Sequence, residues 1–154
     1  METPLYITMV KSLGAAPTPI AWPEVYTSLQ QGVVDGAENN PPSFYLSRHY
    51  EVCGFYTLDE HTWVPDVLLI GTHVWDDLSD QEQAWLREAA RASVMVQREL
   101  WRESTQEALD AVRAAGVEII EPDKEAFRKA AEPMYESFQG TPTFDLLRAI
   151  QEMR

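Results

Sequence analysis

The stretch GAAPTPIAWPEVYTSLQQGVVDGAENN, from Gly14 to Asn40, organises the rest of the chain. The two prolines in residues 17–20 push the residues before them out of the helical region, so this segment should run extended. Pro23 suits the first turn of a helix, and Gly32 stands where a left-handed residue would end it. The stretch therefore predicts an extended entry followed by one short helix.

A short strand and a polar group are expected after that helix. Residues 33–34 are both valine, which favours a strand, and the Asp-Gly pair at 35–36 should end it in a turn. Glu38, Asn39 and Asn40 come next. Because α/β sheets place their ligands at the carboxyl ends of strands, we expect these side chains to face a ligand.

The spacing of this stretch resembles that of one known family, the solute-binding proteins of tripartite ATP-independent periplasmic (TRAP) transporters of the DctP type. Their pattern reads approximately lGA-PTP-(aromatic)-EVY-aLQ-GvvDG-EN. The chain matches it at Gly14-Ala15, Pro17-Thr18-Pro19, Trp22, Glu24-Val25-Tyr26, Leu29-Gln30, Gly32, Asp35-Gly36 and Glu38-Asn39. The resemblance continues through His61 to the helix expected near residues 80–115, so it covers nearly the whole chain.

The resemblance implies a fold and a function. The fold is the C-terminal half of the periplasmic-binding-protein-like type II α/β fold, whose two lobes close over a ligand. The function is capture of a small organic acid in the periplasm and its delivery to TRAP membrane permease subunits, without a cofactor and without covalent chemistry. The run ENNPPSF resembles the subset that takes sugar acids such as uronates, and dicarboxylates are the other ligand class expected.

Outside this stretch, hydrophobic spacing and Gly/Pro punctuation predict strands alternating with helices, which argues for an α/β fold. Residues 67–70 are continuously apolar, as in a strand buried on both faces. Helices are expected at 4–13, 43–52, 123–139 and 143–153, and strands at 55–58, 63–71 and 117–120.

One long helix is expected over 80–115, which contains no glycine and no proline. Ser79 and Glu82 have the spacing of a capping box at its start. At 1.5 Å per residue the helix is about 50 Å long, and in the family such a helix spans both lobes. We therefore divide the chain into a second-lobe α/β segment with the ligand-facing residues (1–58), a crossover strand of the first-lobe sheet (59–78), the spanning helix (79–116) and a C-terminal strand and helices (117–154).

The beginning of the chain suggests a missing N-terminal part. In the family, an arginine that pairs with the ligand carboxylate would lie a few residues before Met1, and no signal peptide follows Met1. We therefore expect the 154-residue chain to be truncated and to bind acids poorly by itself. We also expect it to form a homodimer through 80–115, because an incomplete first lobe leaves apolar surface uncovered.

Composition excludes several classes of function. The formal charge of −13 disfavours nucleic acid and anionic membranes as partners. The lone Cys53 can form no internal disulfide and has no metal-type spacing, so no metal site is expected. No apolar run approaches the length of a membrane span.

Two residues carry the binding hypothesis. Asn39 can both donate and accept hydrogen bonds, and in the family the matching asparagine contacts the ligand carboxylate. The alternative is an Asx-turn that caps the next helix. Trp22 matches the aromatic residue that packs on the ligand's carbon skeleton, and the alternative is a core tryptophan at the helix entry.

Glu38, Asn40 and His61 are further ligand-binding candidates. Asn40 stands where many relatives have proline, so it could add a polar contact, and His61 falls at a hinge-side position where the family often has histidine. A structural histidine is the alternative. Arg48 could replace the missing cation, although a mid-helix surface role is the simpler interpretation.

The sequence Asp59-Glu60-His61 raises an enzyme hypothesis, because a carboxylate beside an imidazole can transfer protons or bind a metal. We expect these residues not to converge, since adjacent side chains of an extended chain point to opposite faces. We find no nucleophile, phosphate-loop or zinc-protease motif in the sequence. Transport is therefore preferred to catalysis, and a fragment that only self-associates or binds a partner is the alternative.

Overall fold

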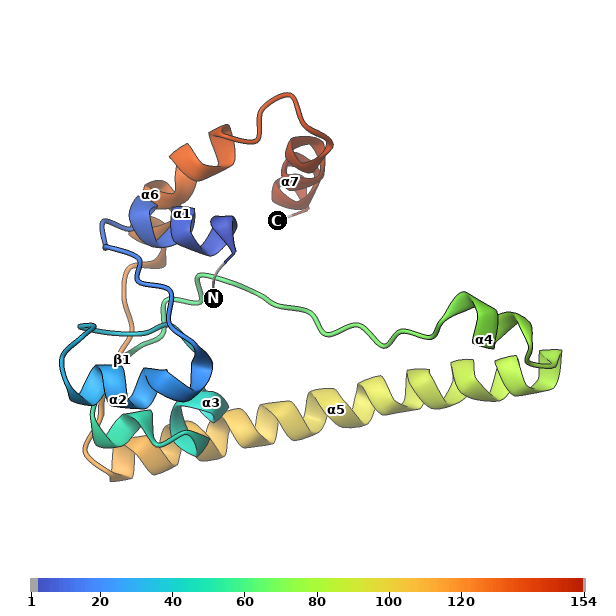
Figure 1. Ribbon diagram of the computed structural model, residues 1–154, viewed down its shortest axis with the longest axis horizontal. Coiled ribbons are helices and arrows are strands. Elements are labelled where there is room, and N and C mark those ends of the chain that lie inside the picture. The colour runs from blue at the N-terminus through green and yellow to red at the C-terminus, as the bar shows by residue number, and fades with distance from the viewer. Residues whose placement is uncertain (1–2, 154) are drawn as a thin grey trace.

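A computed structural model describes residues 3–153, so the outer ends of the predicted segments 1–58 and 117–154 lie outside it. Helices precede and follow each short strand along the chain (Figure 1). The elements are α1 (Pro4–Ser12), the 3-10 helix η1 (Trp22–Glu24), α2 (Val25–Gln30), α3 (Pro41–Leu46), the 3-10 helix η2 (His49–Glu51), β1 (Phe55–Thr57), α4 (Thr72–Asp76), α5 (Asp80–Ala114), β2 (Glu118–Ile120), α6 (Lys124–Glu136) and α7 (Pro142–Glu152).

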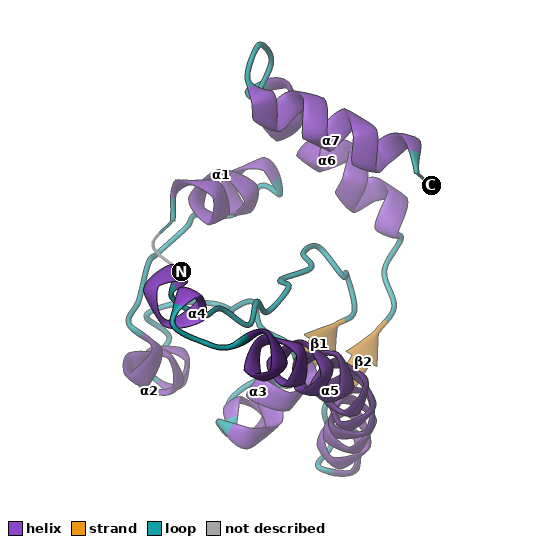
Figure 2. Ribbon diagram, turned by 90° about the vertical axis from the view of Figure 1, so that its right-hand side faces the viewer, coloured by secondary structure: helices purple, strands orange, loops and turns teal. Residues whose placement is uncertain are grey.

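The molecule consists of a body and a long arm (Figure 1). In the body, a two-stranded sheet lies between α3 and the C-terminal part of α5 on one side and α1, α6 and α7 on the other (Figures 1 and 2). The arm is formed by the N-terminal part of α5, by α4 and by the extended segment 62–71, which leads from the body to α4 (Figure 1).

The sheet confirms two predicted strands. β1 and β2 run parallel, with Tyr56 opposite Ile119. Past the end of β1, the Leu58 amide still donates to the Ile120 carbonyl at 2.8 Å. Strand formation follows the aromatic and β-branched content of both segments.

A small core beneath the sheet joins the two parts of the predicted second lobe. Phe44 of α3, Val112 of α5 and Val117 before β2 are buried against one another. Tyr56 of β1 packs on Phe44 with a ring separation of 4.7 Å. The core therefore fixes β1 and α3, the helix that begins directly after the polar loop, to the same end of α5.

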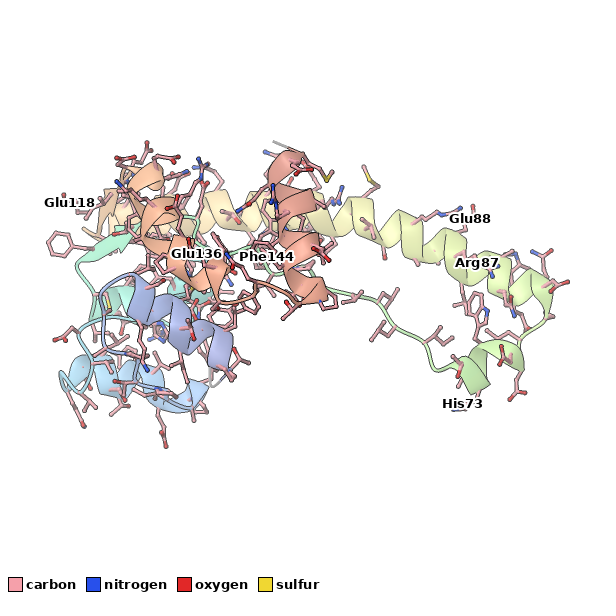
Figure 3. All side chains as sticks on the ribbon, turned by 90° about the horizontal axis from the view of Figure 1, so that it is seen from above. His73, Arg87, Glu88, Glu118, Glu136 and Phe144 are labelled. Carbon is pink, nitrogen blue, oxygen red and sulfur yellow. The ribbon has the colours of Figure 1, made fainter. Side chains whose placement is uncertain are left out.

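The long helix is confirmed, and so is its capping box. The Ser79 hydroxyl accepts from the Glu82 amide, and the Glu82 carboxylate accepts from the Ser79 amide at 2.8 Å. Figure 3 shows the start of α5 far from the body, with α4 folded back against it. The Arg87 guanidinium lies 4.5 Å from the centre of the Trp75 ring and holds this corner together.

Three sequence predictions are wrong in their local detail. Residues 33–34 form a bend, not a strand. The helix expected over 43–52 stops at Leu46, because Arg48 takes a left-handed conformation with φ of 58° before η2 begins. Segment 63–71 runs extended but pairs with no strand among residues 3–153. A strand needs a partner for its amides and carbonyls, and none of the described elements lies beside this segment to supply one.

The segment 63–71 and much of α5 present apolar side chains to solvent. Trp63 is 91% exposed, and Leu69 is 82% exposed. On α5, Trp85, Val96, Leu100 and Trp101 are exposed as well. Among residues 3–153, none of the helices combines the length and the apolar character needed to cross a bilayer.

Candidate ligand-binding site

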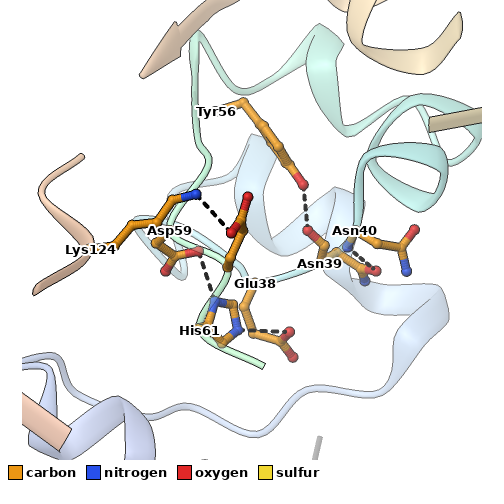
Figure 4. Close-up of polar contacts among 8 residues, drawn as sticks. Glu38, Asn39, Asn40, Tyr56, Asp59, His61 and Lys124 are labelled. Carbon is orange, nitrogen blue, oxygen red and sulfur yellow. Dashed lines mark hydrogen bonds and ion pairs between the residues drawn. The ribbon is translucent and has the colours of Figure 1, made fainter. Parts of the chain in front are cut away.

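The predicted polar residues lie in the loop between the bend at 33–35 and α3 (Figure 4). Asn40 is the N-cap of α3, where its side-chain oxygen accepts from the Ser43 amide at 2.9 Å. This bond satisfies one of the amides that a helix start leaves unpaired. Asn40, rather than Asn39, therefore has the capping role that was the alternative for Asn39.

Asn39 is held by two hydrogen bonds. Its side-chain oxygen accepts from the Asn40 amide at 2.9 Å, and its backbone carbonyl accepts from the Tyr56 hydroxyl at 2.7 Å. Its side-chain nitrogen is paired with no group in residues 3–153. The geometry therefore presents an amide donor, the group that a carboxylate oxygen requires.

His61 connects the polar loop to the end of β1 (Figure 4). Its Nδ1 lies 2.9 Å from Asp59 Oδ1, and its Nε2 lies 3.7 Å from Glu38 Oε2. The first distance is a hydrogen bond, whereas the second is a charge–charge contact too long to be one. His61 is thus engaged by carboxylates on both ring nitrogens, and its side chain is only 16% exposed.

The two carboxylates favour the charged imidazole. The hydrogen bond to Asp59, and after it the contact with Glu38, raise the pKa of His61 to about 9, and partial burial opposes this change. The imidazole is therefore an imidazolium at neutral pH. It neutralises part of the negative charge of the loop that carries Asn39.

The expectation that Asp59 and His61 do not converge is wrong. Asp59 and His61 are two positions apart, a spacing that puts side chains of an extended chain on the same face, and Glu60 between them has a left-handed backbone with φ of 50°. Asp59 and His61 meet on one side, while Glu60 turns outward to Lys124 of α6, with 2.7 Å between Oε2 and Nζ. Within residues 3–153, His, Cys, Asp and Glu side chains form no group of three or more suited to a metal ion.

Trp22 lies in a separate cluster. Its ring packs on that of His49 at 5.3 Å with an interplanar angle of 60°. His49 is buried, and burial lowers the pKa of its imidazole, whereas Trp22 is 50% exposed. Trp22 is thus not a fully buried core residue: one part of its ring rests on the body and the other remains accessible.

Arg48 is not in mid-helix as expected, but it is a surface residue. Its side chain is 74% exposed and lies 3.7 Å from Glu51. Sequence reasoning did not assign Tyr56, Asp59 or Lys124 to the binding site, and it considered Asp59 only in the enzyme hypothesis. The alternating exposure of β1 places Tyr56 on the inner face, and the alternation expected of the strand predicted at 55–58 was the signal that could have identified it.

The sequence matches a known protein family. Residues 1–141 match the family described as "Bacterial extracellular solute-binding protein, family 7", DctP. A solute-binding protein of Chromohalobacter salexigens is 42% identical over 139 residues, which are 90% of this chain and 41% of that protein. The 2,3-diketo-L-gulonate-binding periplasmic protein YiaO of Escherichia coli is 31% identical, over 99% of this chain and 48% of that protein.

Solved structures agree. A TRAP periplasmic solute-binding protein from Chromohalobacter salexigens with bound D-glucuronate superimposes with a TM-score of 0.92 and 40% identity, over 100% of this chain and 52% of that one. One from Bradyrhizobium in complex with D-galacturonate gives a TM-score of 0.85 and 44% identity, over 99% of this chain and 51% of that one.

The chain thus spans about half the length of the relatives that it matches. Its fold is that of the C-terminal half of the type II periplasmic-binding architecture. The matching proteins are binding components of transporters rather than enzymes. The chain belongs to the DctP family of bacterial extracellular solute-binding proteins, the binding components of TRAP transporters.

Proposed function

We propose that this protein captures a sugar acid, of the uronate class, as the periplasmic binding component of a TRAP transporter and delivers it to the membrane permease. The observation that carries the proposal is the Asn39 side chain, whose nitrogen is left to donate while its oxygen and its backbone carbonyl are both occupied. The galacturonate and glucuronate complexes of similar chains support this ligand class.

The remaining polar side chains have supporting roles in this proposal. Glu38 and His61 hold the loop through their charge–charge contact. Asn40 caps the start of α3 with its side-chain oxygen, which leaves its side-chain nitrogen at the end of the loop. Trp22 offers the exposed part of its ring to the apolar face of a sugar, the contact that aromatic rings make with broad surfaces at small entropic cost. No chemical step is required, because capture needs only differential contacts in the open and closed forms.

The site lies between two lobes in this proposal. Segment 59–78 would add a strand to the first-lobe sheet, and α5 would span both lobes, with 1–58 and 117–154 forming the second. The exposed apolar residues of 63–70 and of the arm fit such a role, because a strand buried on both faces is apolar on both.

Binding is tested in a two-lobed chimera, in which the N-terminal half of the Chromohalobacter glucuronate-binding protein precedes this chain. We expect calorimetry to show D-glucuronate binding, and Asn39→Ala to weaken it about 10- to 100-fold, as for one hydrogen bond to a charged group. The 154-residue chain alone should bind at least as weakly as that variant.

Gln30→Ala, an exposed amide at the end of α2, is the matched control and should leave the affinity unchanged. Equal affinity of the Asn39→Ala and parent chimeras would remove Asn39 from the site. Steady consumption of the sugar acid that is lost in His61→Ala would favour an enzyme instead.

We also propose, as the alternative for the chain by itself, a self-associating module. The observation that favours it is the set of exposed apolar side chains on segment 63–70 and on α5. A second copy is the proposed partner, because a twofold axis lets each chain cover the same surface of the other.

A further inference from the structure

Tyr56 joins the polar loop to the hydrophobic core, and none of the ligand candidates does so directly. Its hydroxyl donates to the Asn39 carbonyl at 2.7 Å, the usual distance for a well-formed O–H···O hydrogen bond (Figure 4). Its ring lies 4.7 Å from that of Phe44, within the cluster that includes Val112. The phenol therefore connects the backbone of Asn39 to the buried core of the body.

The direction of the bond is fixed by chemistry. A backbone carbonyl can only accept, so the Tyr56 hydroxyl must donate. Burial, with the Asp59 and Glu38 carboxylates nearby, raises the pKa of Tyr56 to about 12, so the phenol keeps its proton over the physiological range. The phenol therefore remains able to donate this hydrogen bond throughout the physiological pH range.

The same bond constrains the side chain of Asn39. With its carbonyl held by Tyr56 and its Oδ1 held by the Asn40 amide, Asn39 is fixed at both its backbone and its side chain. The side-chain nitrogen of Asn39 is therefore held in one orientation in the free protein. Little further conformational entropy is lost when a ligand binds. Such preorganisation raises affinity because the ordering is already present in the free protein.

We propose that Tyr56 is a positioning residue for the ligand: its hydroxyl sets the backbone of Asn39 so that the Asn39 amide nitrogen is presented to a carboxylate. The inference rests on the proposed function of Asn39 and adds a residue that does not itself touch the ligand. Sequence reasoning assigned Tyr56 only to a strand.

The alternative is a purely structural role, in which only the packing of the Tyr56 ring in the core matters. Tyr56→Phe separates the two interpretations, because it keeps the ring on Phe44 and removes only the hydroxyl. Tyr26→Phe is the matched control: it removes a tyrosine hydroxyl that donates to Glu51 at 3.0 Å, away from the Asn39 loop.

The first readout needs no ligand. In the 154-residue chain, NMR should show that Tyr56→Phe shifts the Asn39 carbonyl carbon and the Asn39 side-chain amide resonances, while Tyr26→Phe leaves them in place. Unchanged Asn39 resonances in Tyr56→Phe would overturn the proposal. A thermal unfolding midpoint close to the parent value confirms that the core is intact.

The second readout is a double-mutant cycle in the two-lobed chimera with D-glucuronate. Tyr56→Phe should weaken binding about three- to tenfold in the parent, the range for one neutral hydrogen bond, and should have no further effect in Asn39→Ala. Equal losses in both backgrounds would show that Tyr56 acts independently of Asn39, against the proposal.

The two readouts separate the two hypotheses. If the parent chimera binds no sugar acid, the proposed function fails, and the ligand-free resonances still decide whether Tyr56 sets the Asn39 loop. If the chimera binds but the cycle is additive, the function stands and the positioning role is wrong.

Discussion

His61→Gln should abolish a pH dependence of stability that the parent protein shows between pH 6.5 and 8.5. The pKa of His61 is raised to about 9, above the value near 6.5 expected in the unfolded chain. The folded state therefore binds a proton more tightly, and its extra stability is complete below about pH 6.5. It is lost as the pH rises from about 6.5 through about 9, because over this range the folded state still holds a proton that the unfolded chain has already released.

We expect the unfolding free energy of the parent to fall by about 2 kcal/mol between pH 6.5 and 8.5. A difference of one bound proton between the folded and unfolded states changes this free energy by about 1.4 kcal/mol per pH unit. The Glu38 and Asp59 carboxylates face the ring on its two nitrogens. The variant should have the lower stability at pH 6.5 and nearly the parent's stability at pH 8.5. Denaturant unfolding at the two pH values measures the difference.

His73→Gln is the matched control, because His73 is an exposed histidine on α4, remote from this cluster (Figure 3). It should retain the parent's pH dependence. A parent protein whose stability is flat from pH 6.5 to 8.5 would contradict the carboxylate–imidazolium contacts.

The 154-residue chain, prepared alone, should self-associate at micromolar concentration. Leu68 is 78% exposed and Val67 is 75% exposed in the unpaired segment, and Trp85 and Trp101 are 60% and 48% exposed on α5. An extended segment with unpaired amides is a template for strand pairing, and the apolar area beside it adds a driving force. Sedimentation or light scattering should therefore give a dimer mass.

Leu69→Glu should shift the equilibrium toward the monomer, because it places a charge in the exposed apolar segment. Leu146→Glu is the matched control: Leu146 is 62% exposed but lies on α7. A stable monomer of about 17.5 kDa for the parent chain would show that the exposed surface does not drive association. Loss of association in both variants would place the interface elsewhere.

The sequence by itself determined the elements whose hydrogen bonds are local. The long helix and its capping box could be predicted because every α5 bond joins residues four apart, and Ser79 and Glu82 lie within one turn. The Asp123 N-cap of α6 has the same local character. The family pattern of Gly14–Asn40 located the polar loop as well, because its punctuation is local.

Only the tertiary structure decided the contacts within that loop. Glu38 meets His61, and Asn39 meets Tyr56, across stretches of chain that no local rule connects. Two left-handed residues, Arg48 and Glu60, lie in the connecting stretches, and because neither is glycine their conformations could not be predicted from local propensity. Segment 63–71 also depends on distant contacts. Its sequence favours a strand, yet a strand forms only where a second backbone lies beside it to accept and donate hydrogen bonds.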